Sequence, residues 1–143
     1  MTTKKLSIEN LTFQTTTIDV SEHILTITLN RPEKKNALNN VMMNEINYAL
    51  AYAKQERSIR VVIIAAEGDV FCAGADLNRK QEESNVPRLE GSDDISLSIR
   101  HLYKPVICKI QGSVHAGALL MLSLIHISEP TRRYAISYAV FCL

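Results

Sequence analysis

Two short apolar runs constrain the fold of this chain more than any other feature of its sequence. The first covers residues 61–66 and reads Val-Val-Ile-Ile-Ala-Ala, and the second covers residues 106–110. The first run has the length of a strand and does not alternate between apolar and polar residues, which is typical of a strand covered on both faces. Strands of this kind belong mostly to parallel sheets. We therefore expect a parallel sheet that contains both runs.

A β-hairpin is predicted before the first apolar run. Residues 13–20 and 24–29 are rich in threonine and β-branched residues, and the polar residues 21–23 separate them. Such segments favour strands, and a short polar connection between them favours an antiparallel pair. The second strand is expected to end at Pro32, because proline cannot donate a hydrogen bond to a neighbouring strand.

Two helices are predicted between the strands. The first begins after Asn39 or Asn40 as its N-cap and runs to about Arg57. Its apolar residues recur at helical spacing: Met43, Ile46, Leu50 and Ala53. The second helix follows a polar loop over residues 82–92 and closes before Pro105. Its apolar residues are Ile95, Ile99 and Leu102. This order of strands and helices predicts an α/β domain with βαβ crossovers.

The composition narrows the class of protein. A chain of 143 residues suits one domain, and 46% hydrophobic with 22% charged residues is usual for a globular protein. The net charge is +1 and only 6% of the residues are aromatic. These values exclude the basic, aromatic-rich surface of a nucleic-acid-binding protein, so a small ligand is the expected partner.

No targeting or metal-binding pattern is found in the sequence. The first residues contain no apolar signal core, and charged or polar residues interrupt the most apolar stretch, residues 106–127. We therefore expect a cytoplasmic protein with no membrane span. The three cysteines have neither disulfide-framework nor zinc-ligand spacing, and we expect buried thiols. They are Cys72, Cys108 and Cys142.

Residues 122–143 are predicted not to belong to the native domain. Residues 122–132 are identical to the translation of one end of a common sequencing-library adapter, and residues 136–143 to that of its other end. Residues 133–135 fall where such adapters carry a sample barcode. We therefore divide the chain into an N-terminal domain over residues 1–121 and an adapter-derived tail over residues 122–143.

Two motifs rich in glycine and alanine follow the apolar runs. Residues 71–77 read Phe-Cys-Ala-Gly-Ala-Asp-Leu, and residues 111–118 read Gln-Gly-Ser-Val-His-Ala-Gly-Ala. Gly74 suits a turn with positive φ, and the second motif opens a helix near Gly117, so both strand ends are expected to expose backbone N–H groups. Two such groups side by side form an oxyanion hole, and tight backbone packing is the alternative role for these small residues.

A third segment strengthens the interpretation of the two motifs. Residues 29–39 read Leu-Asn-Arg-Pro-Glu-Lys-Lys-Asn-Ala-Leu-Asn. In their order and separations the three segments resemble the crotonase superfamily, also called the enoyl-CoA hydratase/isomerase family, and the resemblance spans residues 13–121. It implies a truncated ββα spiral within the α/β class. It also implies an acyl-CoA thioester substrate, with coenzyme A as part of the substrate and no separate cofactor or metal ion, and a homo-oligomeric trimer or hexamer.

The resemblance also assigns the residues of the site. The thioester oxygen would lie between the backbone N–H groups of Ala75 and Gly117. The residues that match the CoA-binding loop of the family are Ala75, Asp76, Leu77 and Asn78, with Ala37 nearby.

The chain departs from the hydratases of this family at one catalytic acid. Those enzymes carry a Gly-Gly-Gly-x-Glu arrangement, whereas here Leu120 stands at the glutamate position and Ala116 and Ala118 replace the outer glycines. The second carboxylate would lie downstream, within the adapter-like residues. This pattern favours an isomerase-type parent enzyme and an inactive chain as given. A non-catalytic acyl-CoA-binding homologue and a fragment without function are the alternatives.

Three other titratable residues lie near the predicted site. His115 is next to the oxyanion motif and is either a substitute base or a packing residue in an irregular loop. Glu82 and Glu83 lie in the loop that borders the acyl pocket in this family. A solvated surface pair is the simpler interpretation of these two carboxylates.

Overall fold

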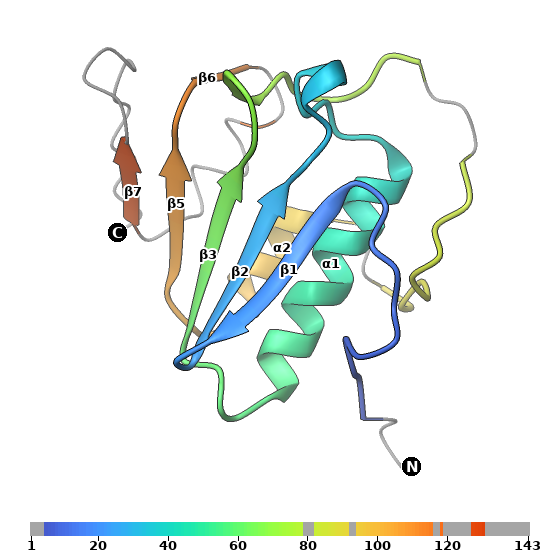
Figure 1. Ribbon diagram of the computed structural model, residues 1–143. Helices are drawn as coiled ribbons and strands as arrows, with labels where there is room; N and C mark the ends of the chain where they lie inside the picture. Colours follow the sequence, from blue (N-terminus) through green and yellow to red (C-terminus); the bar gives the residue numbers. More distant parts are fainter. Residues whose placement is uncertain (1–4, 79–81, 92–93, 116–117, 119–126, 131–143) are drawn as a thin grey trace.

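A computed structural model describes residues 5–78, 82–91, 94–115, 118 and 127–130 of the chain (Figure 1). Its main sheet has the strand order β1-β2-β3-β5-β7, in which β1 is antiparallel to β2 and all other neighbours are parallel. The bounds of these strands are β1 Thr16–Ser21, β2 Ile24–Leu29, β3 Val61–Ala66, β5 Val106–Ile110 and β7 Ile127–Pro130. A second sheet pairs β4 (Val70–Cys72) with β6 (Ser113–Val114). The predicted α/β class, the hairpin and the parallel sheet are confirmed.

The first strand is shorter than the sequence predicts, since β1 begins at Thr16 and not at residue 13. The backbone N–H groups of Gln14 and Thr15 donate to the carboxylate of Glu45 instead of to a neighbouring strand. The hydroxyl groups of Thr15 and Thr16 donate to the same carboxylate at 2.7 and 2.8 Å. The fully buried Glu45 side chain therefore ties the start of the hairpin to helix α1.

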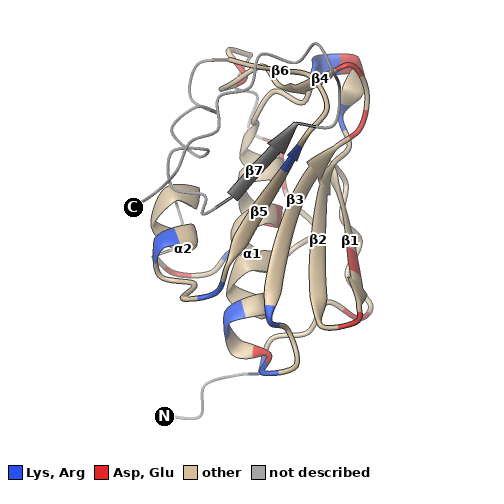
Figure 2. Ribbon diagram, turned by 90° about the vertical axis from the view of Figure 1, so that its left-hand side faces the viewer, with Lys and Arg blue, Asp and Glu red and all other residues tan. Residues whose placement is uncertain are grey.

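Helix α1 (Asn40–Gln55) covers the main sheet from one side. Its N-cap is Asn39, whose side-chain oxygen accepts a hydrogen bond from the N–H of Met42 at 2.9 Å. Helix α2 (Ile95–Arg100) lies on the same side as α1, as the two views in Figures 1 and 2 show. The 3-10 turn η1 (Pro32–Lys34) connects β2 to the segment before α1. Of the two predicted N-caps, Asn39 is thus confirmed and Asn40 is the first residue of the helix, and α1 ends two residues before the expected Arg57.

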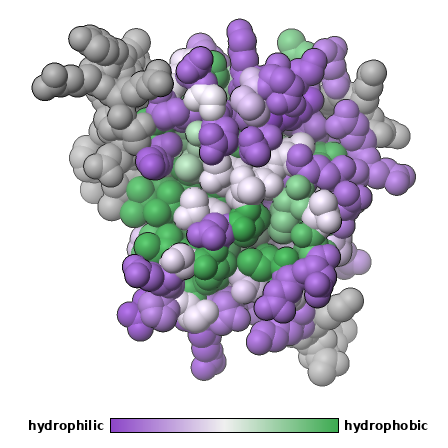
Figure 3. Space-filling view, viewed as in Figure 1, coloured by the Kyte–Doolittle hydropathy of each residue, from purple (hydrophilic) through white to green (hydrophobic). Residues whose placement is uncertain are grey.

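The two faces of the main sheet differ in burial. The inward face contributes fully buried side chains to the core beneath the helices: Leu25, Ile27, Leu29, Val62, Ile64, Val106 and Cys108. The outward face carries threonine and smaller apolar side chains that are only half-buried: Thr26, Thr28, Val61, Ile63, Ala65 and Ile107. Figure 3 shows this outward face as a mixture of apolar and weakly polar surface. The expectation that both faces of the β3 run are covered does not hold within the described residues.

None of the helices in the described ranges combines the length and the apolar character that crossing a membrane requires.

Candidate functional site

The loops that follow β4 and β6 leave the small sheet at the same edge. The two strands are parallel and Cys72 pairs with Val114, so the segments that follow them leave the sheet in the same direction. The backbone N–H of His115 donates to the carbonyl of Cys72 at 3.0 Å, which ties the start of the second loop to β4. Gly112 makes this approach possible, because a Cβ atom there would lie 2.0 Å from the carbonyl oxygen of Asp69. The sequence motifs are therefore neighbours in space.

The N–H group of Ala75 is fixed in direction by its own peptide unit. The carbonyl of Gly74, in the same planar unit, accepts a hydrogen bond from the N–H of Leu38 at 2.8 Å. The N–H of Asp76 donates to the carbonyl of Leu38 at 2.9 Å, which completes an isolated parallel bridge. In a trans peptide the N–H points opposite to the C=O, so the Ala75 N–H points away from Leu38. It donates to no acceptor within the described residues, and Ala75 itself is exposed.

The peptide unit before Gly74 is held by a sulfur atom. The Gly74 N–H donates to Sγ of Cys72 at 3.5 Å, and Gly74 has a φ of 93°, a conformation that favours glycine. The Cys72 thiol in turn donates to the carbonyl of Asn36 at 3.1 Å. Burial raises the pKa of the Cys72 thiol, so the sulfur keeps its proton at neutral pH. The turn that presents Ala75 therefore rests on a protonated, buried side chain.

Asn36 is the second buried anchor of this region. It has a φ of 53° and no exposed surface, and asparagine is one of the few residues that tolerate this backbone conformation. Its side-chain oxygen accepts a hydrogen bond from the N–H of Arg31 at 2.8 Å. Its side-chain nitrogen donates to the carbonyls of Glu67 and Val70 at 2.8 and 2.9 Å. One carboxamide thus joins η1, the end of β3 and the start of β4.

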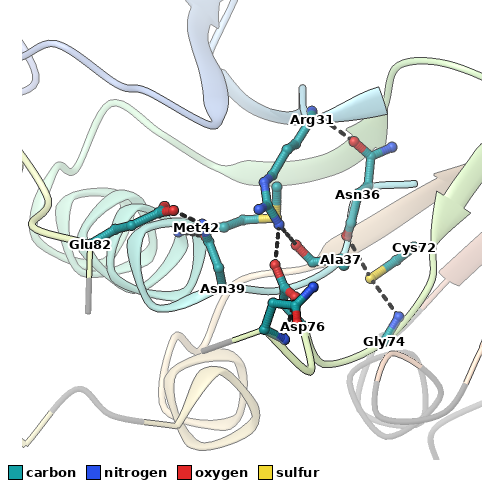
Figure 4. A network of polar contacts seen from close by, with 10 residues as sticks. Arg31, Asn36, Ala37, Asn39, Met42, Cys72, Gly74, Asp76 and Glu82 are labelled. Carbon is teal, nitrogen blue, oxygen red and sulfur yellow. Dashed lines mark hydrogen bonds and ion pairs between the residues drawn. The ribbon is translucent and has the colours of Figure 1, made fainter. Parts of the chain in front are cut away.

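The loop beyond Ala75 is closed by an ion pair (Figure 4). The Arg31 guanidinium lies 2.7 Å from the Asp76 carboxylate and also donates to the carbonyl of Ala37 at 3.1 Å. The hydrogen bond from Arg31, followed by that from the N–H of Asn78, holds the pKa of Asp76 below its ordinary value. The predicted ligand-binding residue Asp76 is therefore ionised and already paired inside the protein.

The structure brings three of the six predicted site residues together. Ala37, Ala75 and Asp76 meet around Arg31 and Leu38, whereas Leu77 is 94% exposed and Asn78 is also exposed. Gly117, Ala116 and Leu120 lie outside the described residues. Their neighbours in the chain are described: the Ala118 N–H donates to the carbonyl of His115 at 3.2 Å, and Ala118 is fully buried.

The other candidate residues, His115, Glu82 and Glu83, do not take part in the contacts described around Arg31 and Leu38. The imidazole of His115 is exposed and has no side-chain partner among the residues that the structure describes. The Glu82 carboxylate accepts a hydrogen bond from the side-chain nitrogen of Asn39 at 3.1 Å. Glu82 and Glu83 both line a cavity of about 860 Å³ between α1 and residues 82–88. Within the described ranges, no group of three or more histidine, cysteine or acidic residues is suited to hold a metal ion.

Three residues of the site were missed by the sequence analysis: Arg31, Asn36 and Cys72. Each acts through a contact far along the chain, and the Arg31–Asp76 pair spans 45 residues. Of the three, only Asn36 could have been found from the sequence, since an asparagine in a segment rich in turn-forming residues indicates a position with positive φ.

Comparison with known proteins relates this arrangement to one family. A family model described as enoyl-CoA hydratase/isomerase matches residues 19–131. The chain is 33% identical to 1,2-epoxyphenylacetyl-CoA isomerase of Escherichia coli over 73% of its length and 42% of the relative. It is 36% identical to trans-2-decenoyl-[acyl-carrier-protein] isomerase of Streptococcus mutans over 70% of its length and 40% of that protein.

Solved structures show the same relationship. The crystal structure of an enoyl-CoA hydratase/isomerase from Pseudoalteromonas atlantica T6c superimposes with a TM-score of 0.71 and 28% identity. The match covers 82% of this chain and 46% of that one. The chain therefore spans less than half the length of these relatives.

Proposed function

Since the chain belongs to the enoyl-CoA hydratase/isomerase family, and has its α/β fold in truncated form, we propose that it binds an acyl-CoA thioester at the loops after β4 and β6. The thioester oxygen is held between the backbone N–H groups of Ala75 and Gly117. The observation that carries this proposal is the Ala75 N–H group, which is fixed in direction, exposed, and unused within the described residues.

The chemistry of a thioester explains why two N–H groups are suited to this site. Removal or transfer of a proton from the α-carbon places negative charge on the thioester oxygen. Donors that are already oriented toward that oxygen stabilise the charge as it develops, and removal of one such donor costs about 3 to 4 kcal/mol in other enzymes. The fixed Gly74–Ala75 peptide unit meets this requirement, because it does not have to reorient during the reaction.

The parent enzyme is proposed to be of the isomerase type. Two of its relatives are named as isomerases, one of 1,2-epoxyphenylacetyl-CoA and one of trans-2-decenoyl-[acyl-carrier-protein]. Leu120 stands where a hydratase of this family would carry a carboxylate. The same residue favours the second candidate, a homologue that binds acyl-CoA without turning it over.

This chain of 143 residues is proposed to be inactive. Oriented donors move no proton by themselves, and a general acid or base contributes a further 10²- to 10⁴-fold. Residues 122–143 are proposed to be adapter-derived, although the family match extends to residue 131 and β7 pairs with β5. An open strand edge accepts extended segments of many sequences, so this pairing does not require a native sequence. Independent sequencing of the parent gene, with different residues after 121 expected, tests this division.

The proposed site is tested with two ligands that differ in one oxygen atom. Butyryl-CoA carries the thioester carbonyl, and S-butyl-CoA is the matching thioether without it. We expect calorimetric titration to show that the chain binds the thioester more tightly, and that Ala75→Pro, which removes one of the two proposed N–H donors, reduces the difference. Equal affinity of the unmodified chain for both ligands, or no binding of either, contradicts the proposed function.

Turnover is tested separately by following the absorbance of a conjugated enoyl thioester. We expect no decay above that seen with Gly117→Pro, in which the second N–H is removed. A clear excess over this control shows that a base such as His115 is sufficient, and it contradicts the proposed inactivity.

A further inference from the structure

We propose that the thiol of Cys72 is a positioning residue that, together with the bond between Leu38 and Gly74, holds the turn that presents the Ala75 N–H group. This inference rests on the proposed function, because it concerns how the thioester oxygen meets its donor. Cys72 is fully buried, so its side chain offers no surface to a ligand. It acts on the turn between β4 and Ala75.

The first step is geometric. Two peptide units precede the Cα atom of Ala75, and the backbone angles of Gly74 connect them. The second unit is fixed by the bond between the Gly74 carbonyl and the Leu38 N–H. The first is fixed by the bond from the Gly74 N–H to Sγ of Cys72 at 3.5 Å. Because glycine has several accessible backbone conformations, the sulfur selects the one with a φ of 93°.

The second step concerns what holds the sulfur. The thiol donates its proton to the carbonyl of Asn36 at 3.1 Å, so the same atom donates on one side and accepts on the other. Asn36 is itself held by three hydrogen bonds of its side chain. The buried surroundings raise the pKa of Cys72, which keeps the donating proton in place.

The third step links the two loops. The carbonyl of Cys72 accepts a hydrogen bond from the N–H of His115, at the start of the loop that leads to Gly117. One residue therefore contacts the loop of the first donor through its side chain and the loop of the second through its backbone. A substitution at Cys72 removes the side-chain contact to the first loop and leaves the backbone contact to the second loop in place. It therefore separates the two contributions.

The experiment compares Cys72 with a matched buried cysteine. Cys72→Ala removes the thiol, and Cys72→Val removes it while it fills the space and suits a strand. Cys108→Ala serves as the control, since Cys108 is also fully buried but lies in β5 within the main sheet. Cys72→Ser restores a group that both donates and accepts. Each variant is titrated with butyryl-CoA and S-butyl-CoA, and the ratio of the two affinities is the readout.

We expect Cys72→Ala and Cys72→Val to lower this ratio about three- to tenfold, the range of one modest hydrogen bond. We expect Cys108→Ala to keep the ratio and Cys72→Ser to restore it within about twofold. A purely structural loss would weaken both ligands together and leave the ratio unchanged. The valine variant decides the question if the alanine variant does not fold.

The outcomes distinguish this inference from the proposed function. An unmodified chain that prefers the thioester, with Cys72 variants that keep the same preference, overturns the positioning role alone. An unmodified chain that does not prefer the thioester overturns the proposed function, and with it the premise of the positioning role. A loss of preference in Cys108→Ala equal to that in Cys72→Ala also overturns the inference.

Discussion

The loop after β4 and the loop after β6 are held in place by different parts of the chain. The first loop, residues 73–78, is held by residues 31–38 through the Arg31–Asp76 ion pair and the bridge between Leu38 and Ala75. The second loop begins with the bond from the His115 N–H to Cys72, and continues with a local bond between Ala118 and His115.

This difference defines an order of dependence within the site. Residues 31–38 position the first loop, and β4 with its Cys72 carbonyl positions the start of the second. A change in residues 31–38 is therefore expected to disturb both loops. The four substitutions below act at successive points of this arrangement.

The largest effect is expected from Gly112→Ala, where β5 passes into β6. Its Cβ atom would lie 2.0 Å from the carbonyl oxygen of Asp69, so the backbone has to move apart. We expect a loss of more than about 3 kcal/mol in the free energy of unfolding, measured in urea. Gly91→Ala is the control, because Gly91 has a φ of 74° but open space around it, and costs about 1 kcal/mol. Equal losses of unfolding free energy in the two variants would show that the close approach of Gly112 to Asp69 does not determine the cost of the substitution.

Asn36→Ala is expected to have the next largest effect. It removes the side-chain partner of the Arg31 N–H and of the Glu67 carbonyl, and it leaves the Val70 carbonyl with only the longer bond from the Gln111 side-chain nitrogen at 3.4 Å. We expect a loss of about 2 to 3 kcal/mol in urea unfolding, together with a weaker preference for the thioester. Asn40→Ala, at an exposed position of α1, should cost less than about 0.5 kcal/mol. If Asn36→Ala is as stable as Asn40→Ala, the anchoring role is wrong.

Gly74→Ala is expected to act mainly on the first loop. A φ of 93° is unfavourable for alanine and costs about 1 to 2 kcal/mol. The turn relaxes toward another conformation and carries the Ala75 N–H with it, so the ratio of butyryl-CoA to S-butyl-CoA affinity should fall. Titration of the variant with each of the two ligands measures this ratio. An unchanged ratio in a folded variant contradicts the proposed dependence of Ala75 on this turn.

The smallest effect is expected from Asp76→Asn, and it depends on pH. The hydrogen bond from Arg31 keeps the pKa of Asp76 low in the folded protein, so the carboxylate stabilises the fold at neutral pH. This stabilisation is lost as the pH falls through the depressed pKa, where the carboxylate takes up a proton. The variant should therefore be less stable than the unmodified chain at neutral pH, with a difference that vanishes in acid.

Urea unfolding between neutral and strongly acidic pH measures this difference. Asp19→Asn, an exposed aspartate of β1, matches the change in net charge. A difference between Asp76→Asn and the unmodified chain that persists unchanged into acid would contradict the ion-pair explanation.

Local sequence patterns predicted the elements that carry the site but not the contacts that fix it. Threonine-rich segments and helical spacing located the β1–β2 hairpin and α1, and Asn39 was found as a cap because capping is a contact between near neighbours. The bonds of Asn36 to Glu67 and Val70 join residues more than 30 positions apart, and a pattern of propensities does not encode such pairs.

Burial was predicted less well than secondary structure. The continuous apolar run over residues 61–66 correctly indicated a strand of a parallel sheet. It did not indicate which layer covers each face, and the outward side chains Ile63 and Ala65 are only half-buried in the described structure. The apolar character of a side chain indicates that it can be buried. Which layer covers it depends on the whole fold, so a local pattern does not predict it.

The central claim, that Ala75 and Gly117 donate to one thioester oxygen, is tested most directly by nitrogen-15 NMR of the two amides. The labelled chain is titrated with butyryl-CoA and, separately, with S-butyl-CoA. We predict that the amide protons of both residues shift downfield with the thioester and stay nearly unchanged with the thioether, because only the thioester offers an acceptor at hydrogen-bond distance. Equal shifts with the two ligands, or a thioester response at only one of the two amides, would contradict the claim.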